Sequence, residues 1–161
     1  MNEKIKFKRI DHFAIAVEDL ERALNHYKDV LGLRLVEMRS TEGEKTGMLS
    51  AVLDAGEFQI VLVQGTSEKS QVNRYIDNYG QGVQHVAIEV DGIETVSQEL
   101  NKQGLEFVTD LIFGDGLKQI FSRRDPSSGV MIELIERTSE SGFQDNNVNN
   151  LFKQLEDKDA Y

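Results

Sequence analysis

The sequence of 161 residues contains no cysteine, which excludes disulfide bonds and thiolate metal sites. Histidine and carboxylate side chains therefore remain as the strong metal ligands. The sequence also lacks an apolar run of about 18 residues, so we expect no transmembrane helix. The first residues, Met1 to Lys6, contain no apolar segment of the kind found in secretory signals. We therefore expect a cytoplasmic protein.

Basic residues are scarce relative to acidic residues. The 18 lysines and arginines and the 28 aspartates and glutamates give a formal net charge of -10. This surplus of negative charge disfavours non-specific binding to nucleic acid and to anionic membranes. The length and the 39% content of hydrophobic residues predict a globular protein with a single domain over 1–161, built from two small halves that share one core.

The chain contains an internal repeat. The motif His-x-Ala-Ile-x-Val occurs twice, first from His12 and again from His85, an offset of 73 residues. Much later in the two copies, Val61 and Glu133 occupy matching strand positions at an offset of 72 residues. The register thus drifts by one residue over the whole copy. An offset this constant indicates two copies of one structural unit.

Each copy is predicted to fold in the order β-α-β-β-β, because alternating apolar segments and helical apolar spacings follow one another in this order twice. The predicted strands are 9–17, 33–38, 48–54, 58–63, 83–90, 105–109, 117–123 and 130–136. The predicted helices begin at Asp19, at Val72 and at a capping-box-like Asp91 with Glu94. The corresponding units are module 1 (about 8–65), a linker helix (about 66–81), module 2 (about 82–137) and a C-terminal tail and helix (138–161).

One such module cannot bury both of its faces alone. We therefore expect an α+β fold in which the two βαβββ modules form a curved mixed-sheet open barrel around a metal cleft. The C-terminal helix is expected to fold back over the cleft or across the surface. The modules can pair within one chain or between two chains, so a homodimer is an open alternative.

Two histidines and one glutamate are the candidate metal ligands. His12 and His85 lie at matching points of equivalent strands and are expected to face the hollow between the modules. Glu133 shares its strand face with apolar neighbours, where an unpaired carboxylate would be costly to desolvate. A divalent cation removes this cost. Two imidazoles and one carboxylate form the facial triad of non-haem Fe(II) oxygenases.

The position of module 1 that matches Glu133 is Val61, which cannot bind a metal. Three protein ligands would leave up to three coordination positions open for substrate and dioxygen, whereas a structural metal site is closed. The alternative interpretation is that both repeat histidines are core residues with ordinary hydrogen bonds, and that Glu133 lies at a strand end near solvent. The third histidine, His26, falls on the polar face of the first predicted helix and is expected to be solvated.

The repeat with its His/His/Glu set resembles the vicinal oxygen chelate (glyoxalase/bleomycin resistance/dioxygenase) superfamily, and most closely the catalytic C-terminal domain of the 4-hydroxyphenylpyruvate dioxygenase family. Residues 82–87, 119–122 and 132–137 resemble that family's Gly-Val-Gln-His-Ile-Ala, Gln-Ile-Phe-Thr and Phe-Glu-Ile-Ile-Gln-Arg. The tail from Gly142 to Lys153 resembles its Gly-Phe-Gly and Asn-Phe-x-x-Leu-Phe run. The likeness covers about residues 10–156.

The resemblance implies that His12, His85 and Glu133 bind iron. The further site residues that it implies are Gln119 as an active-site glutamine, Phe143 as an aromatic residue near the substrate, and Ser50 as a pocket-facing serine. The sequence departs from the family at Val63, where the family has a substrate-facing asparagine, and after Phe143, where it has glutamine in place of glycine.

These inferences predict a non-haem Fe(II)-dependent dioxygenase that is 4-hydroxyphenylpyruvate dioxygenase-like. Its partners would be dioxygen and a small 2-oxo acid, arylpyruvate-like, with neither nucleic acid nor membrane. Zn, Ni, Co and Mn are alternatives to iron. One alternative function is a metal-dependent lyase or isomerase of the glyoxalase and epimerase type, for which Glu42 and Glu44 are poorly placed as bases because they lie in a predicted loop. Another is a metal-free small-molecule binding protein of the same fold.

Overall fold

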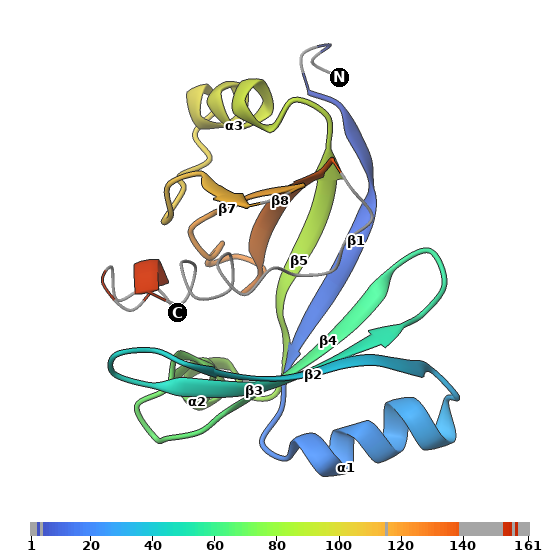
Figure 1. The fold of residues 1–161 in the computed structure, drawn as a ribbon. Coiled ribbons are helices and arrows are strands. Elements are labelled where there is room, and N and C mark those ends of the chain that lie inside the picture. Colours follow the sequence, from blue (N-terminus) through green and yellow to red (C-terminus); the bar gives the residue numbers. More distant parts are fainter. Residues whose placement is uncertain (1–2, 4, 115, 139–152, 156, 158–161) are drawn as a thin grey trace.

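A computed structural model describes residues 3, 5–114, 116–138, 153–155 and 157. Its strands form one curved eight-stranded sheet in the order β2-β3-β4-β1-β5-β8-β7-β6 (Figure 1). In chain order the elements are β1 (Phe7–Ala16), α1 (Leu20–Leu24), the π-helical segment η1 (Asn25–Val30), β2 (Arg34–Glu42), β3 (Gly47–Asp54), β4 (Gln59–Gly65), α2 (Gln71–Tyr79), β5 (Gly82–Val90), α3 (Ile93–Lys102), β6 (Ile112–Gly114), β7 (Leu117–Phe121) and β8 (Met131–Arg137).

The internal repeat is visible in the strand register. Strand β1 pairs with β4 in parallel, with Ala14 opposite Val61. Strand β5 pairs with β8 in parallel, with Ala87 opposite Glu133. Strands β1 and β5 pair with each other antiparallel at the centre of the sheet. The order β-α-β-β-β thus occurs twice, and the predicted α+β class with a curved mixed sheet is confirmed.

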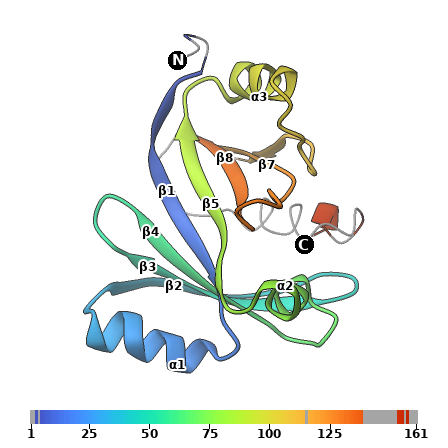
Figure 2. The same ribbon diagram turned by 180° about the vertical axis from the view of Figure 1, so that it is seen from behind.

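The helices lie on the outer faces of the sheet. Helix α1 packs beneath β3 and β4 through a cluster that contains Leu20, Leu53 and Leu62, while α3 packs on β7 and β8 through Ile93 and Leu134. Figures 1 and 2 show α1 and α3 at opposite ends of the molecule, with the inner faces of the sheet between them. In the described part of the chain, none of the helices has the length and apolar character needed to cross a membrane.

The second strand of module 2 differs from the prediction. Strand 105–109 was expected, but this segment contains bends and makes a single bridge between Phe107 and Ser122, and β6 begins only at Ile112. The side-chain hydroxyl of Thr109 accepts a hydrogen bond from the backbone N–H of Phe121 at 3.0 Å. A side-chain acceptor here replaces a backbone acceptor, so the ladder is interrupted before β6 pairs with β7.

The start of α3 also differs from the prediction, which gave the capping role to Asp91 and Glu94. The N-cap residue is Gly92, with φ +70, and no side chain of the helix start caps it. The carboxylate of Glu136 on β8 instead accepts a hydrogen bond from the backbone N–H of Ile93 at 2.8 Å. A distant acid does the work that the local pattern assigned to a neighbour.

Most of the predicted C-terminal helix, including Phe143, lies outside the described residues. Residues 153–155 are helical, and Leu155 is buried. The side-chain oxygen of Gln154 accepts a hydrogen bond from the backbone N–H of Asp110 at 2.8 Å. The described part of the tail therefore contacts module 2.

Candidate metal centre

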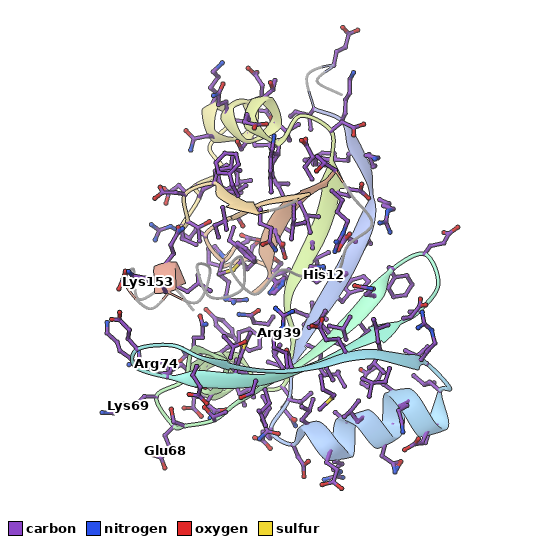
Figure 3. All side chains as sticks on the ribbon, in the orientation of Figure 1. His12, Arg39, Glu68, Lys69, Arg74 and Lys153 are labelled. Carbon is purple, nitrogen blue, oxygen red and sulfur yellow. The ribbon has the colours of Figure 1, made fainter. Side chains whose placement is uncertain are left out.

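Three neighbouring strands at the centre of the sheet carry the candidate ligands. His12 lies on β1, His85 on β5 and Glu133 on β8. The register places His85 opposite Ala14, two residues beyond His12, and Glu133 opposite Ala87, two residues beyond His85. Alternation along each strand then turns the three side chains to the same face. His12 and Glu133 are almost fully buried, and Figure 3 shows His12 near the centre of the molecule.

The three ligand atoms surround one point. His12 Nε2 lies 3.3 Å from His85 Nε2 and 3.1 Å from Glu133 Oε2, and His85 Nε2 lies 3.3 Å from the same carboxylate oxygen. With metal–ligand bonds of about 2.1 Å, neighbouring ligands lie about 3.0 Å apart around an octahedral ion and about 3.4 Å apart around a tetrahedral ion. The measured separations fall in this interval. The residues present therefore fit a single divalent cation.

A polar residue immediately before each histidine holds its ring. Asp11 Oδ1 accepts a hydrogen bond from His12 Nδ1 at 2.8 Å, and Gln84 Oε1 accepts one from His85 Nδ1. Arg137 holds Asp11 in turn through its Nε, at 2.7 Å. When Nδ1 carries the hydrogen, the lone pair lies on Nε2, the atom that faces the shared point. Sequence reasoning missed both supports, although a polar residue precedes the histidine in each copy.

The metal-free centre is electrostatically asymmetric. Burial opposes the charged form of His12, but the charges of Glu133 and Asp11 outweigh it and raise the pKa of His12 to about 9. Burial likewise opposes ionisation of Glu133, but the two imidazoles outweigh it and lower its pKa to about 2. Burial lowers the pKa of His85, whose Nδ1 partner, Gln84, is neutral. At pH 7 the protonated His12 thus faces an ionised Glu133.

A pocket opens from the centre between the two halves of the sheet and has a volume of about 570 Å³, its mouth included. This size is typical of small-molecule sites. Besides the three candidate ligands, its walls are formed by Ala14, Glu37, Arg39, Met48, Ser50, Val52, Val61, Val63, Gln119 and Phe121. Most of these side chains are apolar, so water is largely excluded from the wall around the centre.

Two of the further residues expected in the site line this pocket. Gln119 is buried and donates a hydrogen bond from Nε2 to Glu133 Oε1 at 2.7 Å, so it fixes the carboxylate oxygen that does not face the histidines. Ser50 is buried in the wall formed by β3. Val61 lies in the wall at the position that matches Glu133. His26, expected to be solvated, is exposed.

The pocket also contains an ion pair that sequence reasoning missed. Glu37 and Arg39 lie on β2, and Arg39 Nη2 contacts Glu37 Oε1 at 2.7 Å. Figure 3 shows Arg39 in the central space of the molecule, toward His12. The register of β2 against β3 shifts between Leu35 and Glu37, so Leu35 packs toward α1 whereas Glu37 turns into the pocket. The polar alternation of Glu37 and Arg39 in a strand was the available signal.

A model of the Glyoxalase/Bleomycin resistance protein/Dioxygenase superfamily matches residues 11–121 of the chain. The chain belongs to this superfamily. The match covers β1 to β7 and both candidate histidines. The superfamily includes enzymes of different reaction classes, as its relatives below illustrate.

Three comparisons illustrate this range. Mouse mitochondrial methylmalonyl-CoA epimerase is 30% identical over 132 residues, covering 80% of this chain and 73% of the relative. The 4-hydroxyphenylpyruvate dioxygenase of Legionella pneumophila (strain Corby) is 23% identical over 184 residues, covering 91% of this chain. The chain spans 53% of that relative, about half its length. A variant of 4-hydroxymandelate synthase from Streptomyces coelicolor shares the fold, with a TM-score of 0.85 at 20% identity, over 96% of this chain and 55% of the other.

Proposed function

We propose that the protein is a metal-dependent enzyme whose centre is formed by His12, His85 and Glu133, and that it oxidises a small 2-oxo acid with dioxygen. Bound Fe(II) would supply a Lewis acid and redox centre with vacant positions for both reactants. The observation that carries this proposal is the combination of three converging ligands with a valine at the fourth repeat-related position. A centre with three protein ligands keeps more positions open than one with four.

The symmetry of the sheet makes the role of Val61 specific. Val61 pairs with Ala14 in the first half as Glu133 pairs with Ala87 in the second. A carboxylate or amide at position 61 would reach the centre from the opposite side. The isopropyl group of Val61 instead lines the pocket and provides no ligand. This side of the centre is thus left to the substrate.

The remaining pocket residues orient groups and exclude water. Asp11 and Gln84 fix the two imidazole rings, and Gln119 fixes the carboxylate of Glu133 through its Nε2 donor. The apolar walls keep bulk water away, which strengthens the electrostatic interactions inside. The hydroxyl of Ser50 offers a hydrogen bond to a polar group of a bound substrate. These roles support chemistry at a preorganised centre.

A second function, proton transfer of the epimerase type, is favoured by one specific observation. Such a reaction needs a base that faces the centre, and Glu37 lies in the wall of the same pocket. Sequence reasoning had considered Glu42 and Glu44, and neither is among the described residues that line the pocket. Glu37 would take a proton from a substrate carbon and return it on the other face. The 30% identity to an epimerase supports the same alternative.

Metal reconstitution under controlled oxygen separates the two functions. Metal-free protein is loaded anaerobically with Fe(II), Co(II) or Mn(II), and metal content is measured by elemental analysis. Oxygen uptake that needs both Fe(II) and a 2-oxo acid supports the dioxygenase. Deuterium incorporation into acyl-thioester substrates in heavy water, without oxygen and with Co(II), supports proton transfer. If metal is bound and neither signal appears, both functions are wrong.

Two histidine variants test the assignment of the centre itself. The buried-site variant His85→Ala should lose bound metal, whereas His26→Ala, which changes an exposed histidine, should retain it. Equal metal content in the two variants would contradict the proposed ligand set.

A further inference from the structure

The ion pair of Glu37 and Arg39 shares the pocket with the candidate ligands but has no part in the metal centre described above. We propose that Arg39 binds a second carboxylate of the substrate, so that the preferred substrate is a dicarboxylic 2-oxo acid and not an arylpyruvate. The inference rests on the proposed function in one respect, because it takes the metal centre to bind the first carboxylate and the keto oxygen.

The strand register connects the ion pair to the centre. Glu37 lies opposite Val52, Val52 opposite Val61, Val61 opposite Ala14, and Ala14 opposite His85. Adjacent strands lie about 4.8 Å apart, so β2 is about 14 Å from β1 along the sheet and closer straight across its curved inner face. The side chains between the two ends are small and apolar. This leaves room for a ligand of a few carbon atoms with a polar group at each end.

The two members of the ion pair are buried to different extents. The side chain of Arg39 is 14% exposed and that of Glu37 is 35% exposed. The positive charge therefore lies deeper in the pocket than the negative charge. A guanidinium among apolar side chains needs anionic partners, and its fork of N–H donors matches the two oxygens of a carboxylate. Glu37 holds the guanidinium in place while its planar face of donors remains in the pocket wall.

A neighbouring donor and the charge balance favour the same ligand. Ser50 is directly opposite Arg39 in the strand register, is buried and lines the pocket, so its hydroxyl can bond a group that reaches Arg39. A divalent cation with Glu133 carries one net positive charge, and Glu37 with Arg39 carries none. The loaded pocket thus attracts anions, with two separated cationic points. A dicarboxylate satisfies both, whereas an aryl tail would leave Arg39 facing an apolar group.

Binding of matched acids tests the inference without catalysis. The probes are 2-oxoglutarate and 2-oxoadipate, each compared with 2-oxopentanoate and 2-oxohexanoate, which have the same chain lengths but lack the second carboxylate. Affinities are measured by isothermal titration calorimetry on protein loaded with Co(II) or Zn(II) under anaerobic conditions. We expect at least one dicarboxylic acid to bind about 10- to 100-fold more tightly than its matched monocarboxylic acid.

Variants on β2 locate the source of this preference. Arg39→Met should abolish the ratio between the matched acids and leave the affinity for the monocarboxylic acid within about threefold, while Arg39→Lys should keep part of the ratio. The control is Arg34→Met, on the same strand, because Arg34 is exposed, pairs with Asp54 and lies outside this pocket. It should keep the whole ratio.

Each outcome decides the inference separately from the proposed function. The inference is overturned if wild-type protein shows no preference for either dicarboxylic acid, if metal-loaded protein binds neither, or if the ratio survives in Arg39→Met. If the ratio is present but oxygen uptake never occurs, the oxidation is wrong and the carboxylate site stands. If uptake occurs with 2-oxo acids and the ratio is absent, the oxidation stands and the carboxylate site is wrong.

Discussion

Binding of a divalent cation should release one proton from the candidate centre. In the metal-free protein at pH 7, His12 is protonated because its pKa is raised to about 9, whereas Glu133, with a pKa of about 2, is ionised. His85 is neutral at this pH because its pKa lies below its ordinary value of 6.5. A cation that takes Nε2 of His12 must displace the proton there.

The size of the effect follows from the pKa of His12. Between about pH 6.5 and pH 9 the apparent association constant should rise about tenfold for each pH unit, and above pH 9 it should level off. At pH 7 the competing proton weakens binding by about two powers of ten, or about 2.7 kcal/mol. The sign is positive because the proton and the cation compete for the same nitrogen. Calorimetric titration with Zn(II) or Co(II), in buffers of different ionisation enthalpy, measures the number of protons released.

Asp11 provides the internal control. Its carboxylate is one of the charges that raise the pKa of His12, so Asp11→Asn should move the levelling-off to lower pH and reduce the proton release at pH 7. His26→Ala should leave the release unchanged. A release near zero in wild-type protein at pH 7 would refute the assignment of the proton to His12, and the electrostatic description of the centre with it.

Three further substitutions test other parts of the structure. Val61→Glu adds a carboxylate at the position that matches Glu133, so it should tighten Zn(II) binding at least about tenfold in chelator competition and reduce oxygen uptake by Fe(II)-loaded protein. Gln119→Leu removes the donor to Glu133 Oε1 and should weaken metal binding by about 10- to 100-fold in the same competition; unchanged affinity would exclude an orienting role. Leu62→Ala empties a fully buried position beneath β4 and should lower the free energy of unfolding in urea by about 2–5 kcal/mol, against less than about 0.5 kcal/mol for the exposed Leu31→Ala.

The sequence was sufficient for the fold class and for the convergence of the candidate ligands. The duplicated histidine motif placed His12 and His85 on equivalent strands, and the constant offset identified Val61 as the counterpart of Glu133. These are local and periodic features, and a sheet preserves them, because residues at matching strand positions must lie at matching places in a symmetric register. The structure brings the three ligand atoms within 4.8 Å of one another.

Other features depend on contacts that a linear pattern does not contain. The irregular register of β2 near Leu35 decides which side chains face the pocket, so Glu37 and Arg39 could not be assigned to it from alternation alone. The cap of α3 comes from Glu136, more than 40 residues away. The interruption before β6 depends on the hydroxyl of Thr109 meeting the backbone of β7. In each case a tertiary contact overrides a local preference.

The junction of the two repeats gives the proposed cation a mechanical role. Strands β1 and β5 join the halves, yet their pairing has irregularities on either side of His12, between Ile10 and His12 and between Ala14 and Ile15. One ion bound to His12 from the first half and to two side chains from the second would cross-link the strands at this weakened stretch. Amide hydrogen exchange along both strands should then slow together on metal loading, and a chelator should restore it. Metal content would thus set the cohesion of the duplicated halves as well as their chemistry.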